Sequence, residues 1–162
     1  MSNTQERACH ELWKEVFGDS DSFIAQFMHN YYKKSNMFSI EENGRLVSML
    51  HLITFNCNGH NVGYIYAVAT AAEARKRGHA TQLLREAIAE AQERGLAALL
   101  LIPADEKLRE YYSRLGFKGS YHIEFSTPDN FDFGNEHNNA SLLPLTPDFT
   151  LGHSTSILEH TP

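Results

Sequence analysis

Residues 67–80 read Ala-Val-Ala-Thr-Ala-Ala-Glu-Ala-Arg-Lys-Arg-Gly-His-Ala. This stretch leads from the end of an apolar strand through a basic triplet and a glycine into a long amphipathic helix. The first turn of a helix has unpaired backbone N–H groups and the positive end of the helix dipole, so it attracts anions. Because residues 75–77 add positive charge and Gly78 has no side chain, the junction predicts a site for a phosphate-bearing ligand.

The chain before this junction predicts two helices and then an antiparallel meander. Apolar residues at helical spacing indicate the helices, and Ser20 or Asp21 is expected to cap the second one. Asn43-Gly44 and Asn58-Gly59 are hairpin signals, because both central residues of a type I′ turn need a positive φ. The expected elements are a helix over residues 6–17, a helix from about residue 21, and strands over 37–42, over 45–56 and up to Thr70.

The chain after the junction predicts alternating helices and strands. Gly95 ends the amphipathic helix, and the apolar run between Gly95 and Pro103 is typical of a strand covered on both faces. Residues 127–162 are rich in Asn, Pro, Ser and Thr and indicate mainly loop and tail. The expected elements are a helix from His79, a strand over 96–102, a helix over 105–115, a strand over 117–126 and one further strand over 140–146.

These elements predict a mixed α+β fold, with a central mixed, mostly antiparallel sheet flanked by helices. The 162 residues are expected to form one domain, with a core over residues 1–126 and a C-terminal strand and tail over residues 127–162. The longest apolar run, residues 96–102, is too short to span a bilayer, so no membrane association is expected.

Charge and cysteine usage argue against several classes of protein. The net charge of -6 disfavours nonspecific binding to nucleic acid, which needs clustered Lys and Arg. Cys9 and Cys57 lie far apart in the sequence, without the spacing of a metal or redox motif, which indicates a reducing, cytoplasmic setting. None of the nine histidines forms a His-x-x-x-His pair, so no metal site is expected.

Two motifs make the chain resemble the GNAT superfamily of acyl-coenzyme-A-dependent N-acyltransferases. Arg75-x-x-Gly78-x-Ala80 is similar to the family's (Gln/Arg)-x-x-Gly-x-(Gly/Ala) at a strand-to-helix junction. Residues 112–117, Tyr-Ser-Arg-Leu-Gly-Phe, are similar to its Tyr-x-x-x-Gly-Phe at the end of the following helix. Residues 12–20 and 101–104 also resemble the enhanced-intracellular-survival-type acetyltransferases, of which this chain would hold the acetyltransferase domain only.

The resemblance implies that acetyl-CoA is the co-substrate and that the sheet splays at its site. Unpaired backbone groups at the strand end would pair with the pantetheine arm, and N–H groups of residues 77–80 would hold the pyrophosphate. The implied cofactor-binding residues are Val68, Ala69, Thr70, Arg75, Lys76, Arg77, Gly78, His79, Ala80 and Thr81. Asp105 stands where relatives usually have Asn, and its carboxylate suits a helix cap better than contact with an anionic cofactor.

Tyr112 is the candidate catalytic residue. Attack of an amine on a thioester expels a thiolate that needs a proton, and a phenol with a reference pKa of about 10 holds one at neutral pH. Helical periodicity alone also fits a core role for Tyr112 and does not separate it from Tyr111. The register with Gly116-Phe117 selects Tyr112 by the resemblance.

The general base is left open by the sequence. Glu73 is a candidate base or a charge partner of Arg75 or Arg77, and a water relay is a further alternative. Tyr64 and Tyr66 fit an acceptor pocket or a water chain, whereas His51 fits a packed strand residue better than a base. The aromatic residues of the first two helices are expected to pack in the core, and the alternative is that they form the lip of an acceptor site. They are Trp13, Phe17, Phe23, Phe27, Tyr31 and Tyr32.

Two functions from different classes remain at this stage. The leading one is transfer of an acetyl group from acetyl-CoA to a small-molecule or peptide amine, by direct attack in a ternary complex with Tyr112 as general acid. The alternative is a non-catalytic acyl-CoA-binding sensor or scaffold. The identity of the amine and the formation of a homodimer stay open.

Overall fold

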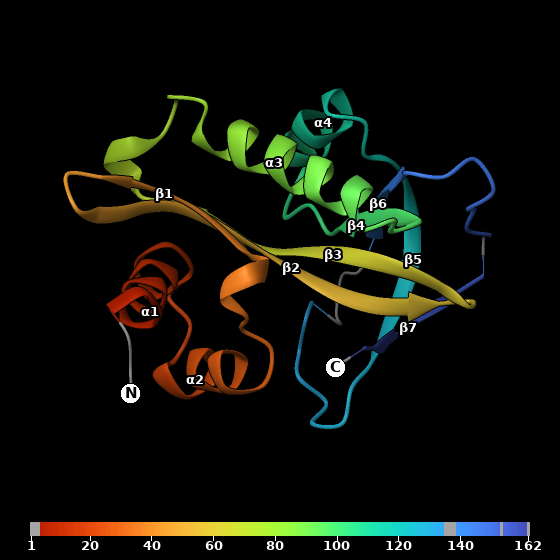
Figure 1. Cartoon of the computed structure of the whole chain (residues 1–162), viewed down its shortest axis with the longest axis horizontal. Coiled ribbons are helices and arrows are strands. Elements are labelled where there is room, and N and C mark those ends of the chain that lie inside the picture. The colour runs from red at the N-terminus through yellow and green to blue at the C-terminus, as the bar shows by residue number, and fades with distance from the viewer. Residues whose placement is uncertain (1–3, 135–138, 153, 162) are drawn as a thin grey trace. The chain divides into compact units, whose positions relative to one another are not determined.

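The structure, a computed structural model, describes residues 4–134, 139–152 and 154–161. It has the predicted mixed α+β class, with a seven-stranded mixed sheet and four α-helices (Figure 1). The elements are α1 (Thr4–Phe17), α2 (Asp21–Asn30), η1 (Lys34–Asn36), β1 (Met37–Glu42), β2 (Arg45–Cys57), β3 (His60–Thr70), η2 (Ala72–Ala74), α3 (His79–Glu93), β4 (Ala98–Leu101), α4 (Glu106–Arg114), β5 (Lys118–Ser126), β6 (Asn139–Pro144) and β7 (Ser156–His160).

The chain groups into two compact units. Unit 1 comprises Met1–Leu52 and Tyr66–Ile88, and unit 2 comprises Ile53–Ile65 and Ala89–Pro162. The elements β2, β3 and α3 therefore contribute residues to both units. The prediction of one domain with a C-terminal strand and tail stays a prediction.

Unit 1 is built on the β1–β2 hairpin. Asn43 and Gly44 at its turn have φ values of 53° and 76°, as a type I′ turn requires, so the hairpin signal is confirmed. The pairing places Glu42 opposite Arg45 beside this turn, and a shift in register leaves Val47 as an extra residue of β2. In Figure 1, α1 lies on one side of this hairpin and the segment between β3 and α3 lies on the other.

The helices α1 and α2 pack around Trp13. Its ring lies 4.9 Å from that of Phe27, measured between centroids, and its Nε1 donates a hydrogen bond to Asp19 at 2.9 Å. Ser20 rather than Asp21 caps α2, because the Ser20 side chain accepts from the backbone N–H of Phe23. Both helices begin close to where the sequence predicted, and α1 ends at Phe17 as predicted.

Unit 2 holds the other part of the sheet, in the order β3-β4-β6-β5-β7. The strand β4 is parallel to β3, with Val62–Tyr64 opposite Ala98–Leu100, and antiparallel to β6. The strand β5 lies between β6 and β7, antiparallel to the first and parallel to the second. β4 is shorter than the predicted strand over 96–102, although Leu96 and Ala97 are buried as well.

The prediction that the chain after residue 146 is only loop and tail is wrong, because β7 is a strand. It pairs along β5 and also with Phe55 and Asn56 of β2. Within β7, buried Ser156 and Leu158 alternate with exposed Ile157 and Glu159. The sequence of these five residues alternates only weakly between apolar and polar side chains. They form a strand because β5 and β2, which are distant in the sequence, pair with them.

No helix in the part of the chain that the structure describes combines the length and the apolar character needed to cross a membrane.

Candidate functional site

The end of β3 has an unusual backbone. Its ladder with β4 ends at Tyr64, and β3 runs on to Thr70. Ala67, in this last part, has a φ of 54°, which an alanine rarely adopts and which re-aims the peptide groups that follow. Val68 and Thr70 are half-buried, so the predicted pantetheine-binding segment keeps partial access to solvent.

The segment that joins β3 to α3 is tied to the hairpin at its start. The backbone N–H of Ala71 donates to the Val47 carbonyl at 2.8 Å, and the Ser48 hydroxyl lies 2.9 Å from the Thr70 hydroxyl. Arg75 folds back on the strand, because its Nε donates to the Thr70 carbonyl at 3.1 Å. These contacts fix the path by which the chain enters the basic triplet.

The helix α3 is preceded by a glycine, which has no side chain to cap it. Gly78 precedes its first residue, His79, and the Gly78 carbonyl accepts from the N–H of Gln82 at 3.0 Å. In α2 and α4, by contrast, Ser20 and Asp105 fill this place with a side-chain oxygen. Gly78 has a φ of 79°, and no atom lies within 4 Å of where a Cβ would stand. The first turn of α3 therefore suits an external anion such as a phosphate.

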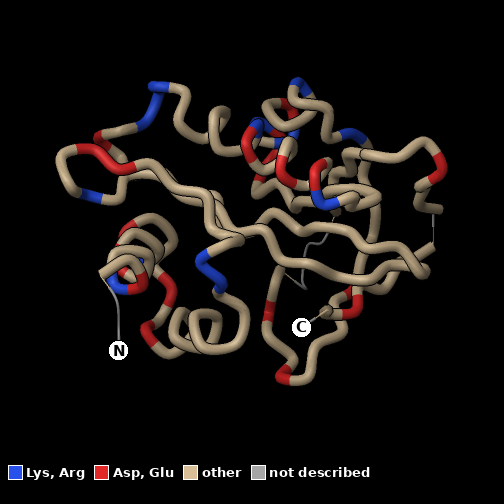
Figure 2. Tube along the Cα trace, in the orientation of Figure 1, with Lys and Arg blue, Asp and Glu red and all other residues tan. Residues whose placement is uncertain are grey.

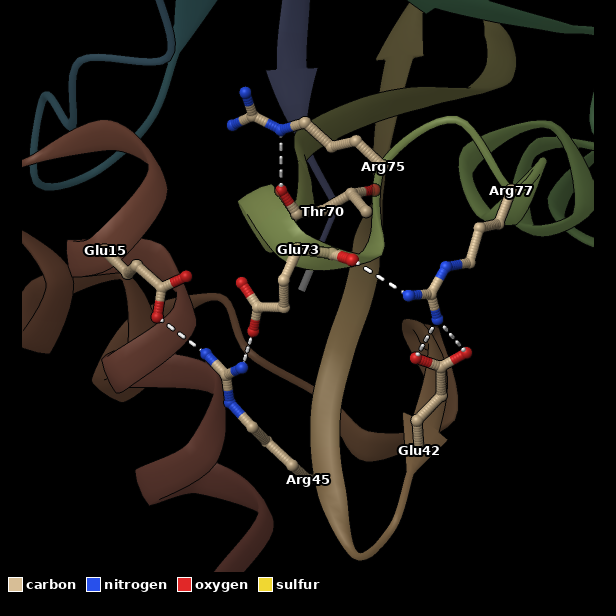
Figure 3. A network of polar contacts seen from close by, with 7 residues as sticks. All are labelled: Glu15, Glu42, Arg45, Thr70, Glu73, Arg75 and Arg77. Atoms are coloured by element: carbon tan, nitrogen blue, oxygen red, sulfur yellow. Dashed lines mark hydrogen bonds and ion pairs between the residues drawn. The ribbon is translucent and has the colours of Figure 1, made fainter.

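The basic triplet divides into residues with different partners (Figure 3). Arg77 Nη1 donates to both oxygens of Glu42 at 2.8 and 3.1 Å, and its Nη2 donates to the Glu73 carbonyl at 3.0 Å. Arg75 and Lys76 are exposed, and Lys76 has a φ of 64°. Figure 2 shows this basic stretch before α3 beside the acidic end of β1. The side chain of Arg77 is thus engaged within the protein.

Glu73 pairs with a residue that the sequence did not suggest. Its carboxylate contacts Arg45 at the start of β2, rather than the side chain of Arg75 or Arg77. Arg45 also pairs with Glu15 of α1 at 2.8 Å. The expected partners of Glu73 were wrong, because the hairpin turn brings Arg45 close and the guanidinium of Arg77 turns toward β1.

Tyr112 lies in unit 2, on α4. The side chain is 7% exposed, and burial, followed by the charges of Tyr111 and Asp105, raises the pKa of its phenol to about 12. No residue in the described ranges accepts a hydrogen bond from its hydroxyl. Among the described residues, the side-chain oxygens that are fully buried and lack a hydrogen-bond partner are those of Thr127 and Thr146. The Tyr112 hydroxyl is not one of them, so it keeps some access to solvent. The hydroxyl can therefore donate its proton to a bound ligand, because no described residue accepts a hydrogen bond from it.

The surroundings of Tyr112 explain its fixed position. The carbonyl of Tyr112 accepts from the N–H groups of Leu115 and Phe117, which turns the chain from α4 into β5. Arg109 anchors the helix by donating to the carbonyls of Gly119 and Asn139 at 3.1 and 2.8 Å. At the other end, Asp105 accepts from the N–H of Leu108 at 2.8 Å, which confirms its predicted role as a cap.

The other candidate residues are mainly structural in this fold. His51 is buried, and burial lowers its pKa to about 3, so it is a neutral core residue as expected. The Tyr64 hydroxyl donates to the Phe133 carbonyl. Tyr66 is half-buried, with its ring 5.6 Å from that of Trp13 and of Phe27. Of the aromatic stripe, Trp13, Phe27 and Tyr31 are core, and Phe17 is 44% exposed.

Sequence reasoning missed Glu42 and Arg45, which hold the segment before α3. No local signal marks them, because the contact between Glu42 and Arg77 joins residues 35 positions apart. Among residues 4–134, 139–152 and 154–161, no group of three or more His, Cys, Asp and Glu side chains is arranged to hold a metal ion.

Comparison with known proteins gives matches of two kinds. A family model described as an acetyltransferase (GNAT) domain matches residues 1–119. No curated protein matches the sequence. Among solved structures, a GNAT family N-acetyltransferase from Escherichia coli in complex with CoA has a TM-score of 0.70 and 16% identity, over 99% of this chain and 87% of that one.

Two further structures share the fold. A GNAT family acetyltransferase from Staphylococcus aureus has a TM-score of 0.65 and 17% identity, over 90% of this chain and 96% of that one. Eis1 from Mycobacterium abscessus has a TM-score of 0.60 and 11% identity, and the match covers 74% of this chain but 31% of that protein. Because the identity to Eis1 is so low, the match extends to the fold alone, and the proposed branch within the superfamily stays a prediction.

Proposed function

The chain belongs to the GNAT family of acetyltransferases, and on that basis we propose that it moves an acetyl group from acetyl-CoA to an amine by direct attack in a ternary complex. Tyr112 acts as the general acid. The acceptor is a small-molecule or peptide amine rather than nucleic acid or a membrane component. The leaving thiolate takes the phenol proton of Tyr112, and the amine loses its own proton to water or to a base.

The start of α3 supports the proposed binding of the CoA pyrophosphate. The backbone N–H groups of residues 77–80, with Gly78 leaving open space, would hold the phosphates. Arg75 and Lys76 would add positive charge from exposed side chains. The further residues of the proposed cofactor site are Val68, Ala69, Thr70, His79 and Thr81, the first three through their backbone.

The observation that carries the catalytic proposal is the state of Tyr112. Tyr112 is largely buried, and its hydroxyl has no acceptor among the residues that the structure describes, so its proton is available to a bound ligand. Its raised pKa keeps the proton in place across the neutral range, and it occupies the tyrosine position of the Tyr-x-x-x-Gly-Phe motif. A general acid has to carry its proton at the working pH, and this pKa ensures that Tyr112 does.

The proposed setting is the cytoplasm. Cys9 and Cys57 are both free and buried, which fits a reducing compartment.

Two measurements test the function. Acetyl-CoA at 100 times its Kd should stabilise the protein by about 2.7 kcal/mol, which a thermal melt detects. A panel of amines, with release of free CoA as the readout, then identifies the acceptor. Tyr112→Phe should keep CoA binding and lower turnover by about a hundredfold or more. Binding without turnover on every amine would favour the non-catalytic sensor, and no binding would overturn both functions.

A further inference from the structure

We infer that Glu42, at the tip of the β1–β2 hairpin, is a positioning residue that sets the conformation of the CoA phosphate loop through Arg77. The phosphate loop is the segment of residues 71–79. The inference rests on the proposed CoA-binding function. It holds that the Arg77 side chain binds Glu42 and the Glu73 carbonyl and does not bind the phosphates.

The carboxylate of Glu42 sits between two residues of the phosphate loop. It accepts two bonds from Arg77 Nη1, and its Oε2 lies 3.2 Å from His79 Nε2. The side chains of Arg77, Glu42 and His79 are 53%, 33% and 14% exposed, so the contact is shielded from water on the His79 side and open on the Arg77 side. Charge-assisted bonds of this geometry are stronger than neutral ones and restrict the direction of the guanidinium.

The second nitrogen of Arg77 continues the contact into the start of the phosphate loop. Nη2 donates to the Glu73 carbonyl, and the Glu73 carboxylate pairs with Arg45 on the other side of the hairpin turn (Figure 3). Arg45 is itself held by Glu15 of α1. The hairpin tip therefore holds the phosphate loop at both of its ends, with Glu42 at one side of the turn and Arg45 at the other.

The backbone between these anchors needs such support. Lys76 and Gly78 have φ values of 64° and 79°. For a residue other than glycine, such as Lys76, this left-handed conformation costs about 1 kcal/mol or more. Arg77 lies between the two residues. Fixing its side chain to Glu42 holds the N–H groups of residues 77–80 in the direction that a phosphate needs before the ligand arrives.

A substitution of Glu42 distinguishes two roles of Arg77, support of the phosphate loop and direct binding of phosphate. The two roles predict opposite changes in the affinity for CoA. A carboxylate near a pyrophosphate is repulsive, so if Arg77 bound phosphate directly, Glu42→Gln would release Arg77 and tighten CoA binding. If Glu42 positions the phosphate loop, the same substitution weakens CoA binding. Glu41→Gln is the matched control, because Glu41 is the exposed neighbour in β1 and loses the same charge.

The experiment measures the Kd for CoA of the wild type, Glu41→Gln, Glu42→Gln, Arg77→Gln and the double variant Glu42→Gln/Arg77→Gln by calorimetry. Glu42→Gln and Arg77→Gln should each weaken binding about tenfold, and Glu41→Gln should stay within about twofold of the wild type. The double variant should be no weaker than the worse single variant, because both changes remove one contact. Thermal midpoints without ligand exclude global unfolding as the cause.

A second readout is kinetic, with the acceptor that the amine panel identifies. Glu42→Gln should raise the KM for acetyl-CoA and leave kcat within about twofold, because the phosphate loop binds the donor and does not touch the reacting atoms. Equal or tighter CoA binding by Glu42→Gln than by Glu41→Gln, or fully additive losses, would overturn the inference while leaving the proposed function intact. A wild type that does not bind CoA would overturn the proposed function and this inference together.

Discussion

The hydroxyl of Tyr64 donates a 2.7 Å hydrogen bond to the carbonyl of Phe133, and both residues are buried. The contact joins β3 to the segment after β5, across 69 positions of sequence. The rings of both residues lie within a cluster that includes Phe55 and Phe125. Tyr64 therefore fastens the segment around Phe133, and its hydroxyl is engaged rather than free to line an acceptor pocket.

Tyr64→Phe should destabilise the protein by about 1–2 kcal/mol, because it removes a buried hydrogen bond. Urea unfolding followed by far-UV circular dichroism measures the change. Tyr121→Phe is the control, since Tyr121 is half-buried on β5 and no described residue bonds to its hydroxyl. Equal effects in the two variants would contradict the assigned role of the Tyr64 hydroxyl.

The pH profile of turnover should reflect the raised pKa of Tyr112. Because burial raises that pKa to about 12, the phenol stays protonated, and kcat should not fall through its ionisation below about pH 10. The measurement is kcat from pH 7 to 10 for the wild type and Tyr112→Phe. An alkaline decline below pH 10 that Tyr112→Phe abolishes would rule out a phenol with this pKa. For stability, a raised folded-state pKa means a loss only above about pH 10.

His51 should make the fold sensitive to acid. Burial lowers its pKa from 6.5 to about 3, so the unfolded chain binds a proton that the folded chain excludes. Stability is therefore lost as pH falls from 6.5 toward 3, by about 2 kcal/mol at pH 5. Cys9, which lies 3.4 Å from His51 Nε2, has a pKa raised to about 12, chiefly by burial, and supplies no compensating charge.

His51→Leu should remove this loss, so its stability should change less between pH 7 and pH 5 than that of the wild type. Urea unfolding at both pH values provides the comparison. His122→Leu, at an exposed position of β5, controls for removal of a histidine. A pH dependence that is the same in His51→Leu and the wild type would show that His51 is not the responsible group.

Gly78→Ala should weaken CoA binding as well as stability. Its φ of 79° makes an alanine strained by about 1 kcal/mol, and the new Cβ would occupy the open space at the start of α3. Gly18→Ala is matched to it, with a φ of 72° and equally open surroundings at the end of α1. Both variants should melt earlier, but only Gly78→Ala should bind CoA more weakly. If both bind CoA as the wild type does, Gly78 is only a turn residue.

Much of the fold could be predicted because its signals are local. The two glycine turns, the cap at Ser20 and the helical spacing after His79 each involve neighbouring residues, and each predicted element is present. The strand β7 escaped prediction, because its five residues gain their structure from β5 and from Phe55 and Asn56 of β2. The positive φ of Ala67 was not predicted either, because an alanine in a sequence gives no signal for a positive φ.

The sequence by itself determined that a basic triplet and Gly78 precede a helix, and that a tyrosine stands four residues before Gly116-Phe117. Only the tertiary structure decided what each side chain does there. It placed Glu42 against Arg77, turned Glu73 to Arg45 and left the Tyr112 hydroxyl without a described partner. The physical reason is range: turn and helix preferences act between neighbouring residues, whereas ion pairing and burial depend on which distant segments the folded chain brings together.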